Sequence, residues 1–295
     1  MKKKPSLILG SILITALLMI NGCTQIRPAL SDIELLKEPV AGFDYTGYAR
    51  LLEEFVDDRG QVDYAQLKKN PGDLNRFYAQ VASFSPDSHP HLFPTESSKL
   101  AYWINSYNCS AIRGVVEHYP IESVADIRPP RLLFFFPGKS GFFFFQRFTF
   151  GGATTSLYYL ENRVIRKRFL DPRYHFALNC ASRGCPELPR EPFSPDPEQL
   201  ERQLDRETKK FIRSKSNVRY NDRENSLYLS SIFKWFESDY TGWLEHRYPE
   251  KEASLTAYVL PYLDNETADL IRQNISTLKV KFLDYDWGLN DQRRK

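Results

Sequence analysis

The chain has 295 residues, of which 40 are lysine or arginine and 37 are aspartate or glutamate. Its hydrophobic fraction of 42%, with 21 phenylalanines and 17 tyrosines, indicates a buried core and excludes a largely disordered chain. Without the three lysines at positions 2–4 the basic residues fall from 40 to 37 and balance the acidic ones. No basic run marks a nucleic-acid groove, so we expect no nucleic-acid partner.

The N-terminus has the pattern of an export signal. The three lysines precede an uncharged, mostly apolar stretch over residues 5–20, and Gly22 then precedes Cys23. This pattern is typical of a signal peptide over residues 1–22 rather than a membrane-spanning helix. A cysteine in this position is the lipidation site of bacterial lipoproteins, and a plain or uncleaved signal is the alternative. With Thr24 next, we expect a lipid anchor on Cys23 in the outer membrane, with the protein facing the periplasm.

Hydrophobic spacing predicts most of the elements in chain order. We expect residues 23–44 to be a tether, 45–290 one globular domain and 291–295 a tail. The helical period predicts helices over residues 45–55, 67–84 with a break at 71–72, 99–118, 156–165, 199–213, 231–236 and 255–263. Turn residues between apolar runs predict hairpins over residues 132–145, 147–152 and 218–229, with a last strand over 280–283.

The fold class that these elements predict is α+β, a helix-rich single domain around a small antiparallel sheet. We expect this sheet to be made of the Phe-rich residues 132–145, the segment around His175 and the hairpin at residues 218–229. The Phe-rich stretch is open to three interpretations: a membrane-facing tip, a partner surface, or a strand buried on both faces. A papain-like or transglutaminase-like layout would suit a Cys/His site by analogy alone.

One segment concentrates groups that can do chemistry. Between positions 175 and 185 it carries His175, Asn179, Cys180, Ser182 and Cys185. The predicted helix over residues 99–118 adds a polar and aromatic cluster. Buried amides require hydrogen-bond partners, so we expect an internal hydrogen-bond brace built from Trp103, Asn108, Asn179 and Ser182. Asn105 shares a helix face with Asn108 and is either part of this brace or part of a functional site.

Several motifs resemble a known family. These are residues 102–108 (YWINSYN), 171–182 (DPRYHFALNCAS) and 185–186 (CP), with further pieces at 62–64 (VDY), 230–236 (SSIFKWF) and 285–290 (YDWGLN). They resemble the bacterial family known as domain of unknown function 547, over roughly residues 45–290. The resemblance implies an exported or lipid-anchored protein. The family has no settled activity, so it implies a fold and a location rather than a reaction.

The first hypothesis is a thiol enzyme, a cysteine hydrolase or transferase acting on an amide or peptide. A cysteine attacks as the thiolate, and a neighbouring imidazole held by a third group assists it. The candidate catalytic residues are Cys180, Cys185, His175, Glu161 and Asn105. Asn179 and the backbone near Gly184 could hold an oxyanion. His175 and Cys180 lie an odd number of positions apart, so in a straight strand they would face opposite ways.

Two other hypotheses use the same residues. In the second, Cys180 and Cys185 form a disulfide that clamps a short loop in a non-enzymatic binding or scaffold lipoprotein. Once Cys23 is lipidated, Cys109 and this pair make an odd number of thiols, so at least one stays free or pairs outside the chain. In the third, His175 and the pair bind a metal, but the spacing H-x4-C-x4-C is not a usual zinc pattern. We therefore expect no metal and no cofactor.

Overall fold

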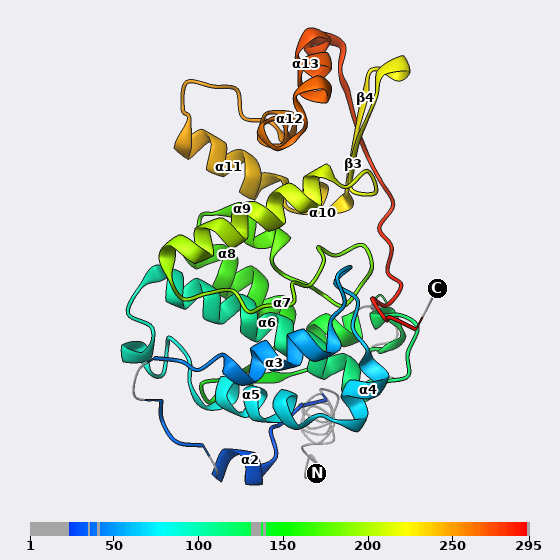
Figure 1. The fold of residues 1–295 in the computed structure, drawn as a ribbon. Coiled ribbons are helices and arrows are strands. Elements are labelled where there is room, and N and C mark those ends of the chain that lie inside the picture. Colours follow the sequence, from blue (N-terminus) through cyan, green and yellow to red (C-terminus); the bar gives the residue numbers. More distant parts are fainter. Residues whose placement is uncertain (1–23, 35, 40–41, 131–136, 138–139, 294–295) are drawn as a thin grey trace, which may run out of the picture.

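A long buried helix, α6 (Glu96–His118), runs through the middle of the fold (Figure 1). It begins at a capping box in which Thr95 and Ser98 exchange side-chain to backbone hydrogen bonds of 3.0 Å. The predicted helix over residues 99–118 is thus confirmed. The computed structural model describes residues 24–293 apart from 35, 40–41, 131–136 and 138–139. The proposed signal peptide, Cys23 and the first half of the Phe-rich stretch lie outside the described residues.

Helices from the first third of the chain cover one side of α6. They are α2 (Leu30–Glu34), α3 (Thr46–Phe55), α4 (Tyr64–Lys69) and α5 (Gly72–Ser83), with a short 3-10 helix, η1 (Pro90–Leu92). The helices predicted over residues 45–55 and 67–84 are confirmed, including the break before Gly72. Ile26 and Phe43, from the segment expected to be a tether, are buried in the same core.

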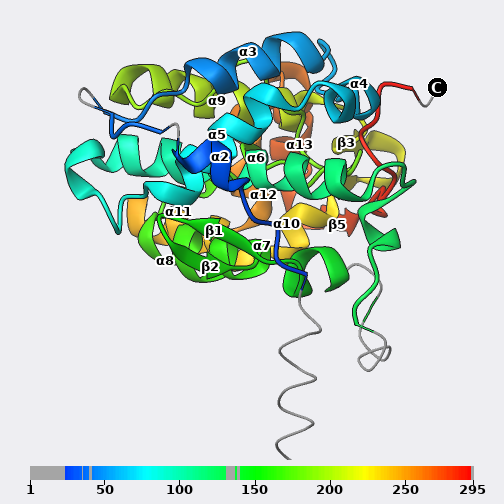
Figure 2. The same ribbon diagram turned by 90° about the horizontal axis from the view of Figure 1, so that it is seen from below.

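The middle of the chain forms a hairpin and an interrupted helix, gathered on one side of the molecule (Figure 2). The elements are η2 (Val124–Asp126), η4 (Gly141–Phe145), β1 (Phe148–Phe150), β2 (Ala153–Thr155), α7 (Leu157–Tyr159), η5 (Leu160–Ile165) and α8 (Arg166–Arg168). The last three follow one another directly and together form the interrupted helix, in which η5 is a π-helical segment. The hairpin predicted near residues 147–152 is confirmed. Its turn is Gly151–Gly152, with φ of +54° and +85°, which glycine adopts without a Cβ clash.

The prediction of a strand over residues 142–145 is wrong. These residues form a π-helical turn, η4, in which Phe142 is fully buried and Phe144 is 40% exposed. Gly141 lies against the carbonyl of Ile127 so closely that a Cβ would overlap it. A run of identical phenylalanines has no period that separates strand from helix, so packing decides the conformation here. The interpretation of residues 132–136 falls outside the described part of the chain.

The last part of the chain builds a second hydrophobic core around Phe176, Phe211 and Phe233. Its elements are η6 (Pro172–Phe176), α9 (Pro197–Arg213), β3 (Val218–Asn221), η7 (Asp222–Glu224), β4 (Ser226–Leu229), α10 (Ser231–Trp235), α11 (Glu237–Arg247), α12 (Leu255–Val259), η8 (Leu260–Tyr262), α13 (Asn265–Gln273), η9 (Ile275–Thr277) and β5 (Lys279–Phe282). The predicted 218–229 hairpin is confirmed. The sheet order is β3-β4-β5, with β4 and β5 parallel.

The α+β class is confirmed, but the prediction of which segments form the sheet is wrong for the segment around His175 and for residues 142–145. The segment around His175 is a 3-10 helix, η6, rather than a strand. Asp171 caps it by accepting the N–H of Arg173, and Pro172 occupies its first turn, where a missing N–H costs nothing. In the described residues, no helix is both long enough and apolar enough to cross a membrane.

After β5 the chain returns to the first core along one edge of the molecule (Figure 1). Backbone hydrogen bonds hold it there, from Leu289 N to Glu122 O at 2.9 Å and from Arg183 N to Gly288 O at 2.7 Å. Val62 N also donates to Asn290 O at 2.9 Å. This return places Tyr285 and Trp287 beside the segment that holds the two cysteines.

Candidate functional site

A cavity of about 370 Å³ lies where the interrupted helix, η6, α10 and the C-terminal return meet. Its walls are mostly aromatic, with few polar groups. The lining residues are Tyr107, Phe143, Phe144, Tyr158, Glu161, Asn162, Arg166, His175, Leu178, Cys180, Cys185, Pro186, Ile232, Trp235, Phe236, Tyr285 and Trp287. Phe144, Tyr158 and Trp235 remain 40–44% exposed. The cavity therefore suits a ligand with an apolar or aromatic body.

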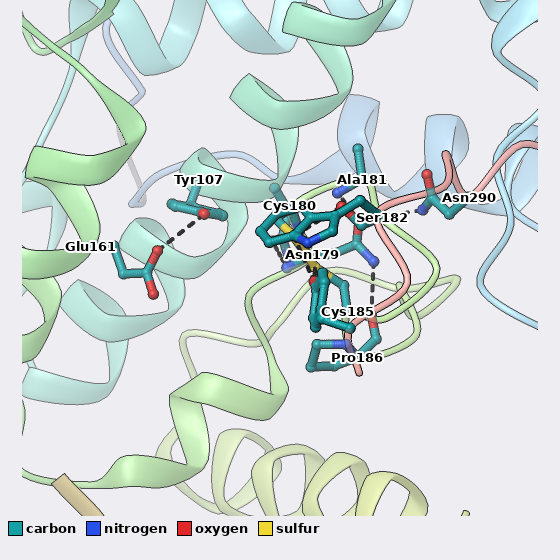
Figure 3. Close-up of a disulfide and its surroundings, with 12 residues drawn as sticks. Tyr107, Glu161, Asn179, Cys180, Ala181, Ser182, Cys185, Pro186 and Asn290 are labelled. Carbon is teal, nitrogen blue, oxygen red and sulfur yellow. Dashed lines mark hydrogen bonds between the residues drawn. A yellow bond between two sulfur atoms is a disulfide. The ribbon is translucent and has the colours of Figure 1, made fainter. Parts of the chain in front are cut away.

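Cys180 and Cys185 form a disulfide in the wall of this cavity (Figure 3). Cys180 is partly exposed, whereas Cys185 is buried. The backbone N–H of Cys180 donates to Cys185 Sγ at 2.9 Å. Tyr285 Oη lies 3.0 Å from Cys185 Sγ and 3.1 Å from Cys180 Sγ, so its single proton can serve either sulfur. The contact of the Cys180 N–H with Cys185 Sγ is shorter than that of Ser182 Oγ with Cys180 Sγ, which is 3.6 Å, so Cys185 has the closer donors.

Buried amides fix the backbone on both sides of Cys180. Asn108 on α6 donates to the carbonyl of Ala177 at 2.9 Å and accepts the N–H of Asn179 at 2.8 Å. The Asn179 side chain donates to the Pro186 carbonyl at 2.7 Å and accepts the N–H of Ala181 at 2.9 Å (Figure 3). Because the Asn179 amide is engaged with Pro186, it holds the loop and is not directed at a substrate oxyanion.

We predict that Asn108→Ala lowers the free energy of unfolding by about 2–3 kcal/mol, because it leaves a buried N–H and a buried C=O without partners. Urea unfolding at neutral pH measures the loss. Asn70→Ala is the matched control, since Asn70 is exposed and makes one long hydrogen bond of 3.5 Å. Equal losses in the two variants would contradict the role given to Asn108.

Glu161 is the carboxylic acid in the cavity wall. Tyr107 donates to it at 3.2 Å, and the two side chains point toward each other beside the disulfide (Figure 3). Burial among rings raises the pKa of Glu161 to about 7, against the smaller lowering effects of the Tyr107 hydrogen bond and the Arg166 charge. Burial likewise raises the pKa of Tyr285 above its usual range. Near neutral pH, Glu161 can therefore both accept and donate a proton.

Glu161 gives the protein a defined pH dependence of stability. Between pH 4.5 and about 7 the folded chain keeps a proton on Glu161 that the unfolded chain releases, so stability falls as the pH rises through this window. We predict that Glu161→Gln removes this loss and is more stable than the wild type by about 3 kcal/mol above neutral pH, with little difference at acid pH. Urea unfolding across this pH range measures the effect. Glu198→Gln, at a side chain 86% exposed, is the control. Parallel pH profiles for Glu161→Gln and the wild type would refute the prediction.

His175 lines the same cavity but serves a different partner. Its Nε2 lies 2.8 Å from Asp239, whose carboxylate also takes two hydrogen bonds, of 2.6 and 2.7 Å, from Arg166. The His175 ring stacks on Phe236 with centroids 4.0 Å apart. Burial lowers the pKa of His175 to about 4, with Asp239 opposing the shift. His175 is therefore a neutral donor to an ionised carboxylate at neutral pH.

This arrangement changes the role expected of His175. The opposite-face problem does not arise, because η6 and the turn after it bring His175 and Cys180 to one cavity. In the described residues, however, no hydrogen bond joins His175 to either sulfur. The imidazole of His175 instead bonds to Asp239, which also pairs with Arg166. Glu161 is the group in the cavity lining whose pKa lies near 7.

The structure separates the other predicted residues. Asn105 lies outside the cavity lining and exchanges hydrogen bonds of 2.8 and 2.9 Å with the Phe193 backbone. Ser182 Oγ is 3.6 Å from Cys180 Sγ. Trp103 Nε1 is buried and has no hydrogen-bond partner within the described part of the chain, so the brace does not include it. No group of three or more candidate metal ligands occurs in the residues described.

Sequence analysis did not identify Arg166, Asp239, Tyr285 or the ring walls as parts of a site. Tyr285 and Trp287 belong to the motif at residues 285–290, which contributed to the family resemblance but indicated no function for either residue. Asp239 follows α10 on a helix that the hydrophobic spacing did not predict, α11. Only the folded chain brings Arg166 and Tyr285 to the cavity that holds the two cysteines, and Asp239 to His175.

The fold and site define an α+β protein with a disulfide in the wall of an aromatic cavity. Residues 93–212 match the family described as "Protein of unknown function, DUF547". Tyr107, Glu161, His175 and both cysteines fall within this match, whereas the motifs at 62–64, 230–236 and 285–290 fall outside it. No curated protein and no solved structure matches the chain.

Proposed function

We propose that this protein carries out thiol–disulfide exchange on small thiols or disulfides with an apolar or aromatic body. The observation that carries the proposal is the Cys180–Cys185 disulfide in the wall of an aromatic cavity, with donors placed on its sulfurs. A disulfide that only clamps a loop needs neither a cavity nor polar groups directed at the sulfurs.

The geometry assigns different roles to the two sulfurs. A substrate thiolate attacks Cys180 Sγ, the more exposed sulfur, and forms a mixed disulfide. The Sγ–Sγ bond breaks and its electron pair goes to Cys185 Sγ, where the Cys180 N–H and the Tyr285 hydroxyl stabilise the thiolate. A second substrate thiolate then releases the oxidised substrate and leaves both cysteines reduced. The reverse steps, with a disulfide substrate, restore the bridge.

Glu161 supplies proton transfer within the cavity. A substrate enters as a thiol, and attack requires the thiolate. With its pKa raised to about 7 by burial, Glu161 can take this proton near neutral pH. Rings at the mouth of the cavity, with Phe144 and Tyr158 stacked 4.0 Å apart, give the apolar body of the substrate a surface to pack against.

The test compares the rates at which benzyl mercaptan and 2-mercaptoethanol reduce the bridge in the full-length protein. Burial of the benzyl ring is expected to favour benzyl mercaptan by about tenfold or more, relative to the same two thiols acting on a free small-molecule disulfide. Cys109→Ser is the matched control and should react like the wild type, because Cys109 is fully buried and does not line the cavity. A bridge that resists both thiols until the protein unfolds would instead support the structural disulfide of a binding or scaffold lipoprotein.

A cysteine hydrolase or transferase acting on amides or peptides is the second candidate, for the reduced protein. The observation that favours it is again the donor pair on Cys185 Sγ, which stabilises a nucleophilic thiolate next to an acid–base group, Glu161. The test treats the reduced protein with an aromatic active ester. Acylation that maps to Cys185 in the wild type, with no acylation of the Cys185→Ser variant, would support this candidate.

We also propose that Cys23 is lipidated and anchors the protein in the outer membrane, facing the periplasm. The lysines at positions 2–4, the apolar stretch and the Gly22–Cys23 step support this proposal. An intramolecular disulfide agrees with an oxidising compartment. Labelling with palmitate in a bacterial host should mark the wild type, and Cys23→Ser should abolish the label.

A further inference from the structure

A second cavity, of about 660 Å³, lies on the other side of the interrupted helix from the disulfide. Tyr158 and Glu161 of this helix line the first cavity, whereas Tyr159 and Arg163 line the second. The remaining walls come from the β1–β2 hairpin, which Figure 2 shows beside α7 and α8, and from the loop after α5, Trp103 of α6 and Arg168 of α8. The proposed thiol chemistry uses none of these groups.

The second cavity carries an excess of positive charge. Arg147, Arg163 and Arg168 line it, with Asp87 as its carboxylate. Asp87 is engaged with Arg168 through hydrogen bonds of 2.6 and 3.0 Å. Within residues 24–293 as described, the side chains of Arg147 and Arg163 make no hydrogen bond or ion pair. Their two charges are therefore not neutralised by the protein.

A buried donor in the same cavity also lacks a partner. Trp103 is 3% exposed, and its indole Nε1 has no hydrogen bond to any described residue. The guanidinium of Arg168 lies over its ring, 5.6 Å from the centroid. The indole nitrogen is covered by protein atoms, so Trp103 offers the cavity ring surface rather than a donor. The hydroxyls of Ser85 and Ser88 add further polar groups to the wall.

We propose that this second cavity binds the phosphate group of a small organic phosphomonoester. The two uncompensated arginines match a phosphate that carries nearly two negative charges at neutral pH. Phe150 and Tyr159, which also line the cavity, provide ring surface for the organic part. The cavity is larger than a free phosphate needs, which favours an ester over the inorganic ion.

The test is calorimetric titration of the full-length protein with phenyl phosphate and with inorganic phosphate at constant ionic strength. We expect saturable binding, with phenyl phosphate about tenfold tighter than inorganic phosphate because its ring is buried. Equal affinities would overturn the assignment to a phosphomonoester, and the absence of saturable binding of phenyl phosphate would overturn the site.

Two variants locate the site. Arg163→Ala and Arg147→Ala each remove one of the two uncompensated arginines; each should weaken phenyl phosphate binding by about tenfold or more, with an unchanged circular dichroism spectrum. Arg223→Ala is the matched control, because Arg223 is exposed in the β3–β4 connection and lies outside this cavity. Equal weakening by the control would show a nonspecific charge effect and overturn the proposal.

Discussion

Replacing Tyr285 by phenylalanine is expected to slow thiol attack on the Cys180–Cys185 bridge by about tenfold to a hundredfold. The hydroxyl lies 3.0 Å from Cys185 Sγ and donates to the sulfur that leaves as a thiolate. A hydrogen bond to a charged group contributes about 1.5–3 kcal/mol, which is the size of this rate change. The ring of Tyr285 packs 4.5 Å from that of Trp287, and phenylalanine preserves this packing.

The rate is measured from the appearance of free thiols after addition of benzyl mercaptan at fixed pH. Tyr248→Phe is the control, because Tyr248 is 41% exposed and lies outside the cavity. The expected slowing in Tyr285→Phe should come without a change in the free energy of unfolding of the oxidised protein larger than about 1 kcal/mol. Unchanged rates in this variant would remove Tyr285 from the mechanism.

The second large effect concerns Asp239, which joins η6 to α11. Its carboxylate takes hydrogen bonds from Arg166, His175 and Tyr174. These bonds outweigh the opposing effect of burial and hold its pKa well below the usual range. Asp239→Ala leaves the buried imidazole of His175 without its acceptor and the Arg166 guanidinium with the Asn162 side chain as its remaining acceptor. We predict a loss of about 3 kcal/mol in the free energy of unfolding, because breaking such a pair exposes the desolvation cost of the remaining charge.

Urea unfolding at neutral pH measures this loss, and Asp286→Ala is the control. Asp286 pairs with Arg183 at 3.0 Å, but the two side chains are 55% and 45% exposed, so removing it should cost less than about 1 kcal/mol. The burial of His175 also makes the stability depend on pH. From pH 6.5 to about 4 the unfolded chain binds a proton on His175 that the folded chain does not, so the free energy of unfolding falls as the pH drops. Similar losses in Asp239→Ala and Asp286→Ala would contradict the structural role of Asp239.

Local patterns predicted much of the fold. The helical period identified α3, α5 and α9, and turn residues identified the β3–β4 hairpin, because each signal is confined to a few neighbouring positions. The Phe-rich residues 142–145 failed because identical side chains carry no period. Helix α11 was missed because its hydrophobic spacing is weak, with Tyr240 and Leu244 as its buried residues.

The site was predictable only in part. Motif content singled out His175, Cys180 and Cys185, and Glu161 was proposed as a carboxylate that could orient the imidazole. The pairing of His175 with Asp239 joins residues 64 positions apart, and the contact of Tyr285 with Cys185 spans 100 positions. No local pattern encodes such contacts. The expected imidazole–thiol pair required a turn between His175 and Cys180. The chain does turn there, but the 3-10 helix capped by Asp171 places the imidazole beside the carboxylate of Asp239.

The decisive experiment is to trap the mixed disulfide in variants that lack one cysteine of the Cys180–Cys185 pair. Full-length Cys185→Ser and Cys180→Ser are each incubated with the disulfide of benzyl mercaptan, and the adduct is mapped by mass spectrometry. The account predicts a stable benzyl adduct on Cys180 in Cys185→Ser, because no second cysteine is present to displace it. It also predicts that reduced wild type leaves little adduct and recovers the Cys180–Cys185 bridge. A variant whose Cys180 takes up no benzyl group while folded, together with a wild-type bridge that no thiol opens, would contradict the account and leave a structural disulfide.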